Sequence, residues 1–126
     1  MWVLCDREPI KERSKGRVTL LGDAAHPMLQ YLAQGAGMAI EDAVVLADKA
    51  AAAGNDVASA FIAYQQQRYL RTGRVQLYAR LYGDLYHANG VNRELRNLIL
   101  REAASKNRKQ AMTWLYDGVT LNQQYE

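Results

Sequence analysis

Two turns in the first third of the chain carry residue types that could bind a ligand. The first holds Asp23, which follows an apolar run rich in β-formers and whose carboxylate could accept hydrogen bonds from sugar-like hydroxyl groups. The second holds Gly35 and Gly37, at the expected start of an Ala-rich helix. Small residues there let a ligand approach the free amides and the positive dipole end, which favour a phosphate or a ring that becomes anionic on reduction. The spacing alone leaves a second interpretation open, in which the glycines only allow two helices to pack closely.

Other chemistries find little support in the sequence. His26 and His87 are the only histidines, and no Cys, His or acidic cluster has metal-ligand spacing, so no metal site is predicted. The serines and Cys5 lack a GxSxG elbow, and there is no GxxxxGK phosphate loop. His26 is therefore expected to be a structural hydrogen-bonding residue rather than an acid or a base.

Composition indicates a globular protein of one modest domain. The chain has 126 residues, 49% of them hydrophobic and 23% charged, which excludes a disordered chain of low hydrophobicity. A net charge of +3 from scattered Lys and Arg argues against a nucleic-acid partner. No apolar stretch is long enough to span a membrane, and the single cysteine, Cys5, is expected to be a small buried side chain in a reducing compartment. A cytoplasmic location is predicted.

Hydrophobic patterns predict a mainly α fold with one or two short β-strands. A strand at 18–21 should be buried on both faces, as in a parallel sheet, and the helix at 37–53 should be buried on nearly every side. Gly54 should end that helix and Asn55 or Asp56 should cap the next, which is expected to break near Thr72 and Gly73. The other expected elements are a strand at 2–5, the helix at 57–87 with an apolar stripe at 61, 64, 70, 77, 81 and 85 and tyrosines at an interface, an amphipathic helix at 94–105, and a short helix or turn at 112–116.

The segment GDAAHPMLQYLAQGAGMAIEDA resembles the second flavin-binding motif of the FAD-dependent aromatic hydroxylases, single-component flavoprotein monooxygenases that act on substrates such as salicylate and 3-hydroxybenzoate. The flanks WVLCDREPI and YQQQRYLRTGRVQLYAR are also similar, and the likeness thins beyond about Asn89. The resemblance implies that Asp23, after Gly22, binds the ribityl hydroxyls of FAD. It also implies that the backbone amides at the helix start face the flavin ring and pyrophosphate region; these belong to Gly35, Ala36, Gly37 and Met38.

Gln30 departs from the commoner family pattern HPMLPY, which has proline at this position. A glutamine places an amide donor and acceptor near the place where, by resemblance, the aromatic substrate meets the flavin. This favours a hydroxybenzoate-type subgroup, with 3-hydroxybenzoate 6-hydroxylation as the expected reaction, over the decarboxylating salicylate type. The alternative is that Gln30 only satisfies the backbone of the loop.

The family's GxGxxG segment, which holds the ADP half of FAD, does not occur in this sequence. The chain is therefore expected to be a C-terminal piece of an α/β, Rossmann-like FAD-binding fold, with a partial FAD-binding region at 1–53 and a helical region at 54–126. It should bind FAD weakly or not at all alone, although the parent enzyme would use FAD and NAD(P)H to hydroxylate a small aromatic acid. Homo-oligomers or association with a missing N-terminal portion are expected. Two alternatives stay open: a helical association module without catalysis, and a basic nucleic-acid binder using arginines between Arg68 and Arg108.

Overall fold

A computed structural model of the chain describes residues 4–104 and 113–117. Helices dominate this part, and its only sheet has two short strands, which confirms the predicted mainly α fold. The elements in chain order are β1 (Ser14–Lys15), β2 (Val18–Thr19), the 3₁₀ helices η1 (Gly22–Ala24) and η2 (Gln30–Leu32), α1 (Gly35–Ala53), α2 (Val57–His87), α3 (Gly90–Ala104) and α5 (Thr113–Tyr116).

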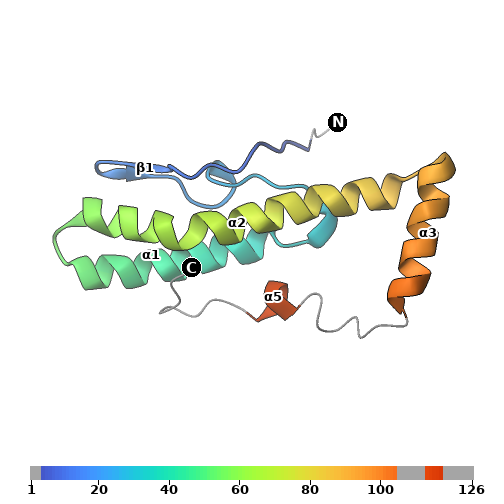
Figure 1. Cartoon of the computed structure of the whole chain (residues 1–126). Helices are drawn as coiled ribbons and strands as arrows, with labels where there is room; N and C mark the ends of the chain where they lie inside the picture. The colour runs from blue at the N-terminus through green and yellow to red at the C-terminus, as the bar shows by residue number, and fades with distance from the viewer. Residues whose placement is uncertain (1–3, 105–112, 118–126) are drawn as a thin grey trace.

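Helices α1 and α2 form an antiparallel pair that is the centre of the fold (Figure 1). Gly54 ends α1 with φ +58°, and its amide donates to the carbonyl of Ala50. Asp56 caps α2 by accepting a hydrogen bond from the amide of Ser59 at 3.1 Å. The predicted end of α1 and the predicted cap of α2 are therefore confirmed, whereas α1 begins two residues earlier than expected.

The prediction of a strand buried on both faces is wrong. β2 pairs antiparallel with β1, so that Ser14 lies opposite Thr19 and Lys15 opposite Val18. The connecting turn has two residues and begins with Gly16 at φ +57°, the conformation that a tight hairpin needs there. Because this hairpin pairs locally and the described chain has no further strand, Val18 is 67% exposed.

The N-terminal segment also differs from expectation. Leu4 and Cys5 belong to no strand, and the rest of the predicted strand at 2–5 lies outside the described residues. Cys5 is exposed, so the expectation of a buried thiol is wrong, because no sheet covers this extended segment. Among the described residues, no helix is both long and apolar enough to cross a membrane.

Helix α1 buries one face rather than nearly its whole circumference. Its buried residues are Met38, Asp42 and Val45, at helical spacings of four and three. Ile40 and Val44 point away from this face and are exposed. The expectation of near-complete burial is wrong because, in the described chain, α1 packs chiefly against α2 and the η1 turn.

Helix α2 runs without interruption from Val57 to His87, so the predicted break near Thr72 and Gly73 is absent. A Cβ placed on Gly73 would lie 3.1 Å from Pro9 Cβ, which shows that this glycine admits the N-terminal segment against the helix. The predicted apolar stripe is also wrong in part, since Leu70, Leu77 and Leu81 are exposed. The buried face of α2 is instead largely polar, with Gln65, Arg68, Arg71, Thr72 and Gln76.

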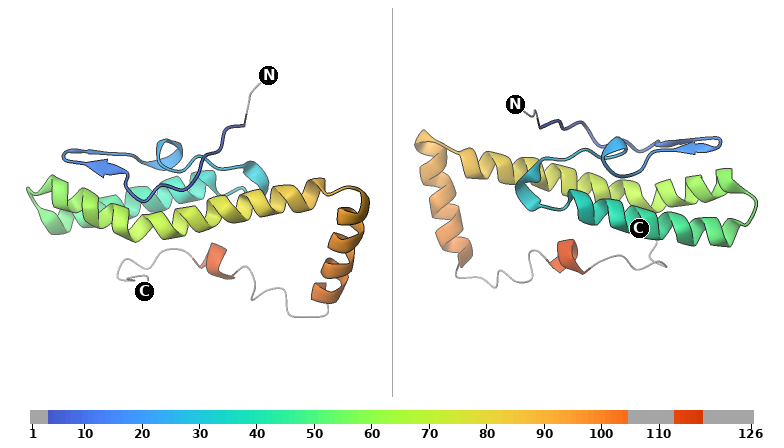
Figure 2. Two further views of the ribbon diagram at one scale, coloured as in Figure 1. Left: turned by 45° about the horizontal axis from the view of Figure 1, so that its top comes forward. Right: turned by 180° about the vertical axis from the view of Figure 1, so that it is seen from behind.

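The remaining elements lie around the helical pair. Figures 1 and 2 show the β-hairpin and the N-terminal segment on one side of α1 and α2, with α5 on the opposite side. α5 falls within the short helix or turn predicted at 112–116; Met112 lies outside the described residues. Its Leu115 is buried with Met38 and Val75, and partly buried Met28, Leu32 and Trp114 pack around them. α3 turns away from the end of α2 at a sharp corner, and begins at Gly90 rather than at the predicted residue 94.

Candidate functional site

The first predicted turn is the single-turn helix η1. Gly22 is buried, adopts φ +56°, and lies so close to α1 that an added Cβ would be 3.4 Å from Ala39 Cβ. The carbonyl of Gly22 accepts from the amides of Ala25 and His26 at 2.9 and 2.8 Å. Asp23 is exposed at the tip of this closed turn. Its carboxylate is therefore displayed to solvent from a backbone that is itself firmly bonded.

The second predicted turn is the N-terminus of α1. Helix geometry leaves the amides of Gly35, Ala36 and Gly37 without an intrahelical acceptor, and the side chain of Gln34 does not cap them. An added Cβ on Gly35 would meet nothing closer than Met28 Cγ at 4.0 Å, so this approach is open. Three free donors at the positive end of a 19-residue helix favour a negatively charged group beside them.

Met38 stands in a different position from the three residues before it. Its amide already donates to the carbonyl of Gln34 at 2.9 Å, and its carbonyl accepts from Arg68 Nη2 at 3.2 Å. Its side chain is fully buried beside Val75 and Leu115. Met38 therefore fixes the start of α1 in the core, and the open donors are those of the preceding residues.

Asp42 joins the two turns. One carboxylate oxygen accepts from the amide of Gly22 at 3.1 Å and lies 2.6 Å from His26 Nε2, while the other accepts from Arg68 Nε at 2.7 Å. Asp42, His26 and Arg68 are all fully buried. The structure thus ties η1 to α1 and α2 through one carboxylate, and His26 has the structural role that the sequence predicted.

Glu41 and Arg71 complete the charge balance. Glu41 accepts from Arg68 Nη1 at 2.7 Å and from two nitrogens of Arg71 at 2.6 and 2.8 Å. Burial raises the pKa of Glu41, but the hydrogen bonds from Arg71 and Arg68 outweigh this and lower it. Burial likewise raises the pKa of Asp42, and the bonds from His26 and Arg68 reverse this and bring it to about 2. The carboxylates of Glu41 and Asp42 therefore stay ionised, and the guanidinium groups of Arg68 and Arg71 balance their charge.

The sequence interpretation missed Asp42, Glu41, Arg68 and Arg71. A signal for them exists: Asp42 lies four residues after Met38 and three before Val45, so it shares their face, and a carboxylate on a buried face needs a cation. The cations come from the segment QQQRYLRTGRVQ, whose polar residues recur at helical spacing. Counting only apolar residues conceals this pattern.

The loop between the two turns is held to α2 from one side. Gln76 Nε2 donates to the carbonyls of Pro27 and Arg7 at 2.9 and 3.1 Å. Arg7 Nη2 in turn donates to the carbonyls of Ala24 and Ala25 at 2.6 and 2.9 Å. Within this loop Gln30 is exposed at the start of η2. These bonds hold the first part of the loop, while the Gln30 side chain further along is exposed.

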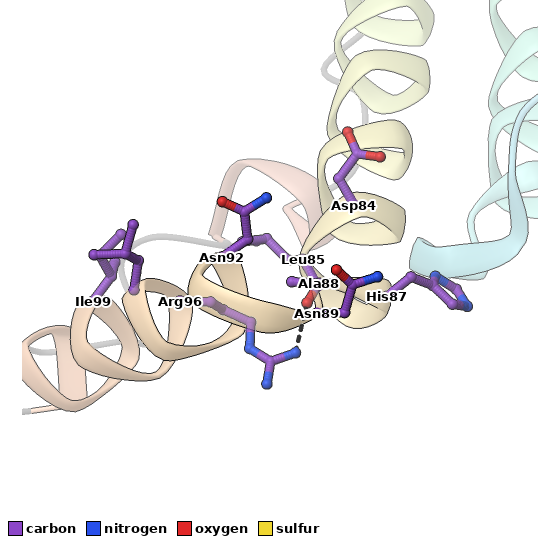
Figure 3. A pocket seen from close by; sticks show the side chains of 9 residues that line it. Asp84, Leu85, His87, Ala88, Asn89, Asn92, Arg96 and Ile99 are labelled. Carbon is purple, nitrogen blue, oxygen red and sulfur yellow. Dashed lines mark hydrogen bonds between the residues drawn. The ribbon is translucent and has the colours of Figure 1, made fainter.

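Other candidate sites are weaker. A hollow of about 500 Å³ lies at the corner of α2 and α3, but none of the predicted site residues lines it (Figure 3). Among its lining residues, Arg96 Nη1 donates to the carbonyl of Leu85 at 2.8 Å. Across the described residues, no three His, Cys, Asp or Glu side chains are grouped as a metal site would require.

Comparison with known proteins agrees with this geometry. The chain is 50% identical to 3-hydroxybenzoate 6-hydroxylase of Polaromonas naphthalenivorans (strain CJ2), over 91% of this chain and 29% of that protein. It is 49% identical to 3-hydroxybenzoate 6-hydroxylase 2 of Aquipseudomonas alcaligenes, over 91% of this chain and 36% of that protein. A crystal structure of a Klebsiella pneumoniae HpxO variant complexed with FAD superimposes with a TM-score of 0.73 at 33% identity, over 89% of this chain and 29% of that one.

These relatives confirm the resemblance to FAD-dependent aromatic hydroxylases, and the chain spans about a third of their length. Residues 7–76 match the family described as FAD binding domain. The match includes η1, the N-terminus of α1, and the buried charges of Asp42 and Arg68. Since it covers more than half of the chain, the protein belongs to the FAD binding domain family.

Proposed function

We propose that this chain forms one wall of the FAD site of an aromatic-ring monooxygenase that uses NAD(P)H. The observation that carries the proposal is the pairing of an exposed Asp23 with the open N-terminus of α1, because the buried carboxylate of Asp42 on α1 holds the turn of Asp23 through the amide of Gly22. The relatives named above, which are 3-hydroxybenzoate hydroxylases and a protein complexed with FAD, support it.

The residues present fit FAD. Asp23 would accept hydrogen bonds from the ribityl hydroxyls, and the amides of Gly35, Ala36 and Gly37 would donate to the ring and pyrophosphate region. The open approach at Gly35 leaves room for a planar ring. The positive end of α1 would favour negative charge there. When bound, FAD supplies electron transfer from NAD(P)H and the activation of O₂ for ring hydroxylation.

We propose a small aromatic acid of the hydroxybenzoate type as substrate. Gln30 supports this, because its side chain is exposed at the start of η2. An amide in that position can donate to a substrate carboxylate or accept from a phenol. The 3-hydroxybenzoate relatives favour this class over salicylate.

The isolated chain should bind FAD more weakly than micromolar and should show no NADH-dependent turnover, because a cofactor site assembled from several segments loses most of its affinity when one segment acts alone. Titration of the purified chain with FAD, followed by flavin fluorescence and calorimetry, measures this. Micromolar or tighter binding with turnover would contradict the expectation.

A chimera tests the role of the residues directly. Residues 7–76 of this chain would replace the matching segment of the Polaromonas 3-hydroxybenzoate 6-hydroxylase, and FAD content and 3-hydroxybenzoate hydroxylation would be measured. We expect D23A to weaken FAD binding by at least about tenfold, because it removes a charged acceptor, and D48A on the outer part of α1 to leave it unchanged. A D23A chimera with normal FAD affinity would sink the assignment of Asp23.

The cytoplasm stays the proposed location, and association with a further protein portion or a second copy stays the proposed assembly. The exposed apolar residues of α1 and α2, such as Ile40 and Leu77, support association. None of the comparisons supports the alternative of a helical association module without catalysis.

A further inference from the structure

Tyr31, the neighbour of Gln30, lies directly on the backbone of α2 at Gly83. A Cβ built on Gly83 would be only 2.5 Å from Cε2 of the Tyr31 ring, 2.8 Å from Cδ2 and 3.3 Å from Cζ. Real side-chain contacts do not come this close, so any residue other than glycine would displace the ring. Gly83 is buried, 26 residues after the N-terminus of α2, and has no capping or turn role that would otherwise require glycine.

The Tyr31 ring is also fixed from its sides. It meets the rings of Tyr86 and His87 edge-on, with centroid distances of 5.9 and 5.4 Å. His87 is itself held, since its Nδ1 lies 2.8 Å from the carbonyl of Gly83. Figure 3 shows the His87 side chain directed toward the η2 segment. Gly83, Tyr86 and His87 in the last turn of α2 thus form a packing site for the Tyr31 ring, called the seat of Tyr31 below.

The backbone after Tyr31 shows that the surrounding packing determines this turn. Leu32 packs against the core of Met38, Val75 and Leu115. Ala33 adopts φ +52°, a left-handed conformation uncommon for a residue with a Cβ, and its amide donates to the carbonyl of Gln30 at 2.9 Å. Such a conformation persists where neighbouring contacts over-determine it. The contacts of Tyr31 and Leu32 therefore leave Gln30 as the outward residue of η2.

We infer that Tyr31, seated on Gly83, is the positioning residue that sets where Gln30 presents its amide to the aromatic substrate. The inference rests on the proposed function, because Gln30 is the substrate-facing candidate there. Placement of the substrate then depends on α2 near residues 83–87. Placement of the flavin-facing turns depends instead on Asp42 and Arg68. Tyr31 acts through Gln30.

Nuclear magnetic resonance of the isotope-labelled full chain tests this through a double-mutant cycle. In the wild type, the ring current of Tyr31 should shift the Hα resonances of Gly83 away from their random-coil positions, and Y31L should remove this shift. G83A should remove the seat and move the side-chain amide resonance of Gln30 and the backbone resonances of η2. In the Y31L background, G83A should cause little further change at Gln30, because the clashing ring is gone. Y31F keeps the ring and should leave Gln30 in place.

G73A is the matched control, since it places the same methyl group in the same helix but against Pro9 at 3.1 Å. It should leave the Gln30 resonances unchanged. A G83A chain whose Gln30 and η2 resonances stay at their wild-type positions would overturn the inference, as would equal effects of G83A with and without the Tyr31 ring.

Added ligand separates this inference from the proposed function. With FAD and 3-hydroxybenzoate added at millimolar concentration, which populates even a complex weaker than micromolar, the wild-type chain should respond at the amides of residues 35–37 and at the Gln30 side chain. G83A should reduce the Gln30 response at least about threefold while the response at 35–37 remains. If the wild type responds at neither place, the proposed function loses its support, and the cycle on the ligand-free chain still decides whether Tyr31 positions Gln30. A G83A response at Gln30 equal to that of the wild type would count against the inference.

Discussion

Asp42 accepts three hydrogen bonds, from the Gly22 amide of η1, from His26 in the following loop and from Arg68 of α2. Because Arg68 beside it is also fully buried, removing the carboxylate charge leaves a guanidinium without part of its balance. We expect D42N to lower the free energy of unfolding by about 3–5 kcal/mol, as measured by urea denaturation with far-UV circular dichroism. D48N, which removes only a partly exposed bridge to Lys49, should change it by less than about 1 kcal/mol. Equal effects of the two variants would contradict this account.

The low pKa of Asp42 in the folded chain predicts that the free energy of unfolding decreases at acid pH. Its pKa lies at about 2 in the folded chain against an ordinary 3.8, so the folded state binds this proton less readily than the unfolded state. The resulting stability, about 2 kcal/mol, is present above about pH 4 and is lost as the pH falls toward 2. The urea midpoint of the wild type should therefore fall over this interval more steeply than that of D42N. Parallel pH profiles would show that Asp42 is not the group responsible.

At the scale of elements, local signals in the sequence predicted helix ends well. Gly54 and Asp56 define the α1–α2 turn by properties of single residues, namely freedom to adopt positive φ and a side chain that caps amides. The predicted span of α2 matches the observed Val57–His87 at both ends. The GD and GAG turns that the sequence singled out lie at the starts of η1 and α1, where Asp23 and Ala36 are exposed; their role in binding FAD stays a prediction.

What the sequence did not predict depends on partners distant along the chain. The polar face of α2 is buried because Arg68 and Arg71 pair with acidic residues on α1 about 27 residues earlier in the chain. A count of apolar residues alone therefore placed the buried stripe on Leu70 and Leu77, which are exposed. The seat of Tyr31 on Gly83 joins residues 52 positions apart and leaves no periodic signal. Val18 appeared buried because its apolar type cannot distinguish a sheet strand from one side of a hairpin.

Helix α5 reaches the candidate site from the other side of the helical pair. Leu115 is 2% exposed beside Met38, and the carbonyls of Trp114 and Leu115 accept from Arg71. We expect L115A to lower the free energy of unfolding by about 2–4 kcal/mol and to shift Trp114 fluorescence to the red in a W2F background. Y116A, which truncates an exposed ring, should do neither. An L115A chain with unchanged emission would mean that α5 does not depend on this contact.

At the scale of the whole molecule, the described chain leaves much apolar surface uncovered. Exposed residues of this kind lie on α1, on α2 and along α3, and include Ile40, Leu77 and Ile99. On α1 the exposed residues Ile40 and Val44, and on α3 Leu95 and Ile99, are four residues apart and so share one face of each helix. The molecule therefore has faces suited to association.

We expect the chain to elute above its monomer mass of 14.2 kDa in size-exclusion chromatography with light scattering, increasingly so at higher concentration. The double variant L95S/I99S should reduce the associated fraction if α3 provides the contact, and I40S/V44S should reduce it if α1 does. A clean monomer at high concentration would count against association through either face.

The corner between α2 and α3 has a consequence for local unfolding. No side chain described in α3 is buried, and one link back to α2 is the bond from Arg96 to the carbonyl of Leu85. A helix of 15 residues that buries none of its described side chains is only marginally stable in water. The amide protons of α3 should thus exchange with solvent at rates close to those of a free peptide, while those in the buried middle of α2 exchange only on global opening. Slowed exchange in α3 would then report directly that another surface has covered it.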